Sequence, residues 1–147
     1  MIQGHRWLIV GGILFADLWF TAHALATEIT VYKDPKCGCC VKWITHLRQN
    51  GFTVSAIDVS DTQGIKSNYG VPKQLGSCHT GIVEGYVVEG HVPADVIQRL
   101  LKERPKYTGI AVPGMPMGSP GMEGPQSTHY DIIGFDAQGN TTVFTSR

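Results

Sequence analysis

Two different spacings of hydrophobic residues alternate near the start of the chain. From Glu28 to Lys33 apolar and polar residues alternate with a period of two, and Phe52 to Val59 repeats this pattern, which is typical of strands. Between them, from about Cys39 to Asn50, apolar residues recur at the spacing of one helical face. The residues on that face are Val41, Ile44 and Leu47, with Trp43 beside them. The pattern predicts a strand, a helix and a second strand.

The middle of the chain continues with short elements. Ser60 to Gly76 predicts one or two short helical turns, because glycine and proline interrupt it. Thr80 to Val83 and Tyr86 to Val88 predict two strands joined by a turn at Glu84-Gly85. A helix is predicted from Pro93 to Arg104, with apolar residues on one face.

The pattern changes after this helix. Glycine and proline fill more than half of residues 109–125, which predicts a long loop without regular structure. The loop contains Met115, Met117 and Met122. Residues 130–145 predict a β-hairpin that turns near Gln138-Gly139-Asn140.

The predicted element order indicates an α/β fold. Strand, helix, strand, short helix, strand, strand and helix match a thioredoxin-like layout, in which helices flank a mixed sheet. A right-handed crossover would make the first two strands parallel neighbours. We expect a thioredoxin-like variant with a Gly/Pro/Met-rich loop and a carboxyl-terminal hairpin, all in one domain over residues 27–147.

Residues 1–26 resemble a secretory signal peptide. One basic residue precedes an apolar run, and Ala24-Leu25-Ala26 places small residues where a signal peptidase reads. The alternative is a retained membrane anchor. The apolar run is shorter than the ~20 residues of a spanning helix, and Asp17 interrupts it. We therefore expect cleavage after Ala26 and a periplasmic protein that does not insert stably into the membrane.

Charge and motifs argue against several classes of function and direct attention to the cysteines. The formal net charge is zero, which argues against a nucleic-acid partner. No paired carboxylates or phosphate-binding glycine loop suggest hydrolysis or nucleotide binding. Four cysteines are present, and in an exported protein they must be paired, metal-bound or actively kept reduced.

Three of the cysteines lie together in the segment DPKCGCCVKW. Cys37 and Cys40 are three residues apart at a predicted helix start, where backbone N–H groups favour thiolate, so they suit a redox pair. Cys39 and Cys40 are adjacent, which would strain a disulfide between them. Cys39 could instead pair with Cys78 or act as a third sulfur donor.

Cys78 and His79 precede a predicted strand. In thioredoxin-like folds the loop before this strand passes close to the cysteine motif. By this analogy the sulfurs of all four cysteines would converge.

The methionines favour a soft metal ion. Thiolate and thioether ligands together select copper(I), whereas zinc prefers cysteine and histidine. The alternative is that the methionines only fill gaps in packing. His79 and His91 could be ligands or ordinary hydrogen-bonded loop histidines, and His46 is expected at the surface.

Three segments together resemble one family. They are VYKDPKCGCCVKWITHLRQNGF, GVPKQLGSCHTGIVEGYVVEGHVPADVIQRLLKERP and GIAVPGMPMGSPGME, within Ile29 to Glu123. They are similar to the CopG family of periplasmic copper-resistance proteins, long described as a domain of unknown function. The resemblance implies a variant thioredoxin fold that binds copper, with several ions in a thiolate cluster, and a part in copper redox handling.

The motifs transfer residue by residue. Cys37, Cys39 and Cys40 match the CxCC motif of the family, and Cys78 with His79 matches its CHT segment. Met115, Met117 and Met122 match its methionine loop. With His91 added from the histidine analysis, these nine residues form the expected metal site.

Three hypotheses follow. The first is a copper-resistance protein that holds Cu(I) in clustered thiolates, coupled to thiol redox state, with copper ions and other periplasmic copper-handling or redox proteins as partners. Such a protein could also act as a copper/thiol oxidoreductase. The second is a metal-independent thiol–disulfide oxidoreductase that uses Cys37 and Cys40. The third is a binding module in which the cysteines form only structural disulfides.

Overall fold

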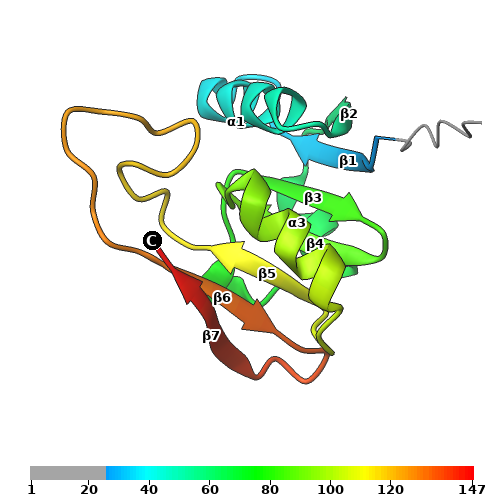
Figure 1. Cartoon of the computed structure of the whole chain (residues 1–147). Helices are drawn as coiled ribbons and strands as arrows, with labels where there is room; N and C mark the ends of the chain where they lie inside the picture. Colours follow the sequence, from blue (N-terminus) through cyan, green and yellow to red (C-terminus); the bar gives the residue numbers. More distant parts are fainter. Residues whose placement is uncertain (1–25) are drawn as a thin grey trace, which may run out of the picture.

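The computed structural model describes residues 26–147, and Figure 1 shows its fold. The predicted signal peptide lies outside these residues except for Ala26. Within residues 26–147, three α-helices and one short 3-10 helix accompany seven strands. The strands are β1 (Glu28–Lys33), β2 (Thr53–Asp58), β3 (His79–Val83), β4 (Tyr86–Gly90), β5 (Gly109–Val112), β6 (Asp131–Phe135) and β7 (Thr141–Ser146). The helices are α1 (Gly38–Gln49), α2 (Thr62–Asn68), the 3-10 helix η1 (Lys73–Leu75) and α3 (Ala94–Glu103).

All seven strands form one mixed sheet in the order β2-β1-β3-β4-β5-β6-β7. The predicted parallel pairing of β1 with β2 is confirmed, since Glu28 lies opposite Thr53 in parallel register. The β3–β4 hairpin is also confirmed, and its turn residues Glu84 and Gly85 both have positive φ, as a tight two-residue hairpin turn requires. The fold class is therefore α/β, as expected.

The predicted loop over residues 109–125 begins too early. Gly109–Val112 forms β5, which pairs in parallel with β4 and antiparallel with β6. A Cβ atom at Gly109 would lie 2.3 Å from the Val87 carbonyl oxygen, so the glycine serves close strand packing and does not mark a break. The run Ile110 to Val112 is fully buried, as in a central strand.

Helices cover both faces of the sheet. One core packs α1 and α3 against one face, with Trp43, Leu47 and Ile97 fully buried. A smaller core on the other face includes Leu75 and Phe135. The prediction that Val41 belongs to the buried face of α1 is wrong, because its side chain is 51% exposed. Trp43 occupies the buried face instead.

None of the helices within residues 26–147 combines the length and the apolar character that a membrane crossing requires.

Candidate metal centre

The sheet topology brings several chain segments to one end of the molecule. β1 ends at Lys33, which lies opposite His79 at the start of antiparallel β3. β4 and β5 end beside each other at Gly90 and Val112. The segments that follow or precede these points therefore meet: the start of α1, the Cys78 loop, His91 and the loop after β5. Figure 1 shows that this last loop extends toward α1.

The cysteine motif forms the amino-terminal cap of α1. The Cys37 sulfur accepts a hydrogen bond from the Cys40 backbone N–H at 3.2 Å. Cys37 and Cys40 form a disulfide, whereas Cys39 and Cys78 are free. Backbone N–H groups and the positive end of the helix dipole would stabilise thiolate at Cys37 after reduction.

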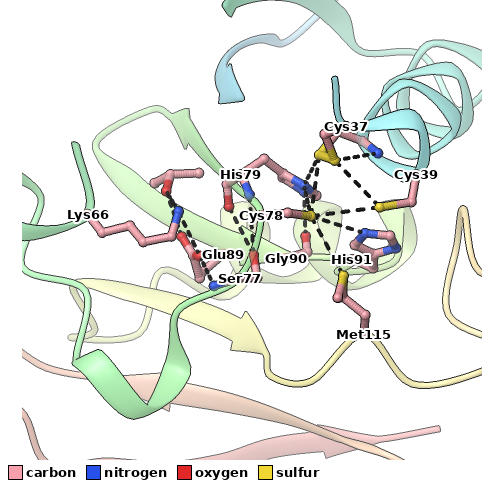
Figure 2. A network of polar contacts seen from close by, with 12 residues as sticks. Cys37, Cys39, Lys66, Ser77, Cys78, His79, Glu89, Gly90, His91 and Met115 are labelled. Atoms are coloured by element: carbon pink, nitrogen blue, oxygen red, sulfur yellow. Dashed lines mark hydrogen bonds and ion pairs between the residues drawn. A yellow bond between two sulfur atoms is a disulfide. The ribbon is translucent and has the colours of Figure 1, made fainter. Parts of the chain in front are cut away.

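The predicted convergence of four sulfurs is confirmed. The Sγ atom of Cys78 lies 3.3 Å from that of Cys40 and 3.8 Å from that of Cys39. The Sγ atoms of Cys37 and Cys39 are 3.5 Å apart. All four sulfur atoms lie within 4.8 Å of one another. Figure 2 shows Cys78 reaching toward the motif from the loop before β3.

His79 presents an unprotonated nitrogen to these sulfurs. Its Nε2 lies 3.0 Å from the Gly90 carbonyl oxygen, which can only accept, so Nε2 carries the proton. Burial, followed by the nearby His91, lowers the pKa of His79 to about 3. The ring is therefore neutral, and Nδ1 faces the Sγ atoms of Cys40 at 3.3 Å and Cys78 at 3.5 Å with a free lone pair.

His91 completes a second group of donors. Its Nε2 lies 3.8 Å from the Cys78 sulfur, so that Cys78, His79 and His91 can offer ligand atoms within 4.8 Å of one another. Burial lowers the pKa of His91, and the nearby Pro120 backbone and Glu123 carboxylate only partly oppose this. Its buried Nδ1 has no hydrogen bond of normal geometry within residues 26–147.

The three methionines of the loop differ in position. The Met115 sulfur lies 3.8 Å from that of Cys78 (Figure 2). In the described part of the chain, no such sulfur contact involves Met117 or Met122. The Met117 methyl group lies instead against Gly124. The structure thus brings one methionine to the cluster.

Cys78 itself is a poor acid in the metal-free protein. Burial, followed by the charge of Cys39, raises the pKa of the Cys78 thiol to about 12. A metal ion bound to this sulfur would displace the proton, because only thiolate ligates strongly. Once the Cys37–Cys40 disulfide is reduced, the four cysteine sulfurs, the Met115 sulfur and the two neutral imidazoles fit a soft ion better than a hard one.

Sequence reasoning missed two supports of the site. The Trp43 ring packs on the His79 ring, with centroids 4.3 Å apart, and donates its indole N–H to the Val92 carbonyl oxygen. His46, predicted at the surface, is half-buried and accepts a hydrogen bond from the Ala94 backbone N–H at the start of α3. The sequence placed Trp43 in a helix that begins at the cysteine motif, which could have suggested its contact with the site. Nothing in the sequence around His46 suggested its hydrogen bond.

Known proteins resemble this chain over most of its length. Two solved structures of the copper resistance protein copG, forms 2 and 1, share 47% and 46% identity with it, at TM-scores of 0.78 and 0.79. The alignments cover 82% and 83% of this chain and 98% of each copG chain. The family model described as "Protein of unknown function, DUF411" matches residues 75–122. No curated protein gives a significant match.

Proposed function

Because this chain belongs to the CopG family of copper-resistance proteins, we propose that it binds copper(I) in its cluster of cysteine sulfurs. The proposed ligand set consists of the four cysteines, with His79, His91 and Met115 completing the coordination. Met117 and Met122 are assigned to the loop that carries Met115. The observation that carries the proposal is the convergence of four sulfur atoms within 4.8 Å from two distant segments.

The choice of copper(I) rests on the chemistry of the donors. Thiolate and thioether sulfur prefer soft monovalent copper to zinc or to hard oxygen-seeking ions. Both histidines are neutral at physiological pH, because burial lowers their pKa values. Neutral imidazole is the form that binds metal.

The disulfide couples copper binding to redox state. Cys37 and Cys40 cannot act as thiolates while they are bonded to each other, so an external dithiol must first reduce them by exchange and itself become a disulfide. After copper(I) leaves, an external disulfide can accept two electrons and two protons from the two thiols, which forms the Cys37–Cys40 disulfide again. In this scheme the oxidised protein is the metal-free form.

Anaerobic titration of the reduced protein with copper(I), against a chromophoric competitor, tests the proposal. We expect tight binding by the reduced protein and much weaker binding by the disulfide form. Binding that is equally weak in both forms, or that is unchanged in Cys37→Ser and Cys78→Ser, would contradict it.

A second function is favoured by the disulfide itself, which closes a CxxC segment at a helix start. Such a pair is typical of metal-independent thiol–disulfide oxidoreductases. Metal-free protein should then turn over a disulfide substrate, with loss of turnover in Cys40→Ser and full turnover in Met115→Leu. Absence of turnover without metal would remove this alternative.

The last part of the proposal concerns where the protein acts after export. We assign the copper-binding function to the periplasm, after cleavage of the signal peptide following Ala26. Mass spectrometry of the protein from the periplasmic fraction would test this, since a first residue other than Thr27 would contradict it.

A further inference from the structure

A buried ion pair lies directly behind the Cys78 loop. Lys66 of α2 is 3% exposed and Glu89 of β4 is fully buried, and their Nζ and Oε1 atoms are 3.3 Å apart. Taking two charges out of water is a poor route to stability, because their desolvation offsets much of their attraction. The position of this pair beside the Cys78 loop therefore suggests a role other than stability.

The hydrogen bonds of the pair are directed at the loop. Glu89 Oε1 accepts from the Ser77 backbone N–H at 2.5 Å, and Oε2 accepts from the Thr80 hydroxyl at 2.7 Å. Lys66 donates to the same Thr80 oxygen at 3.1 Å. One carboxylate therefore holds the residue before Cys78 and the residue after His79. Figure 2 shows this network beside the sulfur cluster.

Two further contacts fix the segment between these points. The Ser77 hydroxyl donates to the His79 carbonyl oxygen at 3.1 Å, and the His79 ring donates to the Gly90 carbonyl oxygen. Gly90 directly follows Glu89 on β4, so the same strand holds both the backbone of the loop and the histidine ring. Little freedom is left to the Cys78 sulfur, which lies 3.3 Å from Cys40.

We propose that Lys66 and Glu89 are positioning residues that hold Cys78 and His79 against the Cys37–Cys40 motif. The proposal deepens the proposed function, on which it rests for the role of Cys78 as a ligand. Lys66 orients the buried carboxylate, and Glu89 holds both ends of the loop through its two oxygens. Removing the charge of Glu89 would free Cys78 while α1 and its cysteines stay in place.

Thiol alkylation of the metal-free, disulfide-containing protein tests this. Cys78 and Cys39 are its two free thiols, and only Cys78 is held by the network, so Cys39 is an internal control. In Glu89→Gln we expect the alkylation rate of Cys78 to rise about tenfold or more, as for loss of a hydrogen bond to a charged group. Thr80→Val removes one of the bonds to Glu89 but keeps its charge, so it should also speed the alkylation of Cys78. A rise in Glu89→Gln alone would reflect only the lost carboxylate charge, which raises the pKa of Cys78, and would overturn the proposal. The rate of Cys39 should change much less, because Cys39 lies on α1 and meets the network only through its sulfur contact with Cys78. Mass spectrometry resolves the two sites.

Glu103→Gln is the matched control variant. Glu103 also forms an ion pair, with Arg99, but both side chains are exposed and neither residue belongs to the network around Cys78. It should leave both rates unchanged. A parallel rise of Cys39 and Cys78 in Glu89→Gln would indicate general loosening and overturn the proposal, as would no change at Cys78. These measurements contain no copper, so they are independent of the copper(I) titration of the unmodified protein.

Hydrogen exchange of the unmodified protein keeps the proposal testable should Glu89→Gln fail to fold. The Ser77 amide should exchange at least about a hundredfold more slowly than an unstructured amide, as expected for a bond broken only by local opening. Exchange of Ser77 at the unprotected rate would overturn the proposal.

Discussion

The two loops that meet the cysteine motif are built in opposite ways. The Cys78 loop, residues 76–78, lies against a buried ion pair and leads directly into the core strand β3. The methionine loop, residues 113–130, is largely exposed, and Met115 at its sulfur contact is 38% exposed. Each loop brings one sulfur to the cluster, but the carboxylates that bind the two loops differ. Glu89, which holds the Cys78 loop, is fully buried, whereas Glu123, which accepts from the Gly121 N–H within the methionine loop, is exposed.

This difference suits the two loops to two different roles at a metal site, one in affinity and one in access. The neutral, hydrogen-bonded unit of half-buried Cys78 and fully buried His79 can fix donor atoms before the metal arrives, which lowers the ordering cost of binding. An exposed thioether that covers the same sulfur can move without disturbing the core. We infer that the first loop sets affinity and that the second controls access.

The largest effect is expected from Cys78→Ser. This change removes the sulfur that contacts Cys39, Cys40 and Met115, and a hydroxyl is a poor ligand for copper(I). Copper(I) affinity of the reduced protein should fall by at least about 100-fold, the upper range for loss of even an outer partner of a ligand. Competition titration measures this, and thermal unfolding checks that the fold is kept. An unchanged affinity would place the metal elsewhere.

Acid should lower the stability of the protein through His79, which adjoins Cys78. The methionine loop offers no such effect through its thioethers, because they do not titrate. The pKa of His79 is lowered by burial to about 3, so between about pH 6.5 and pH 3 the unfolded chain binds a proton that the folded chain does not. Stability is therefore lost as pH falls through this window, at up to about 1.4 kcal/mol per pH unit from this group.

Urea unfolding of the metal-free protein at pH 7, 6 and 5 measures this loss, with His79→Gln as the comparison. The stability of the variant should depend less steeply on pH, by about 1 kcal/mol per unit. Parallel curves for the two proteins would contradict the lowered pKa of His79.

The sequence predicted the Cys78 loop better than the methionine loop, and the reason is physical. Alternating apolar residues predicted β1 and a short apolar run predicted β3, but the approach of Cys78 to the motif was predicted only by analogy with thioredoxin-like folds. The antiparallel pairing of β1 with β3 supplies the physical reason, because it brings Cys78 to the end of β1 where α1 starts. After residue 109 glycine and proline dominate, so periodicity carried no information, and β5 was missed although it is central. Met115 makes the sulfur contact with Cys78 from a turn in which both it and Gly114 have positive φ, and the sequence pattern did not separate it from Met117. The Lys66–Glu89 pair joins α2 to β4 and left no signal in either segment.

Gly121→Ala should disturb the attachment of the methionine loop to α1. Gly121 has φ of +89°, and a Cβ atom there would lie 2.9 Å from the Cys39 carbonyl oxygen and 3.0 Å from the Trp43 backbone nitrogen. Backbone atoms cannot give way cheaply, so we expect a loss of about 1–3 kcal/mol of stability. Gly139→Ala is the matched control, because Gly139 has a similar φ of +81° but open space around it. Equal losses in urea unfolding would show that only backbone strain matters.

Met115→Leu should give the smallest effect and bears most directly on the comparison. The change removes a sulfur 3.8 Å from that of Cys78 and keeps the apolar volume. Thioether is a weaker ligand than thiolate, so we expect copper(I) affinity to fall by only about 3- to 10-fold, while release of copper to a competitor accelerates.

The methionine loop contains its own control for this measurement. Met117 is 40% exposed, close to the 38% of Met115, but makes no sulfur contact with the cysteines among the described residues. Met117→Leu should therefore leave both affinity and release rate unchanged. If the two variants behave alike, the loop acts through its bulk and not through one thioether. Met115→Leu could instead lower copper(I) affinity as far as Cys78→Ser does. The inference that the Cys78 loop sets affinity and the methionine loop controls access would then be wrong, because both loops would contribute equally to affinity.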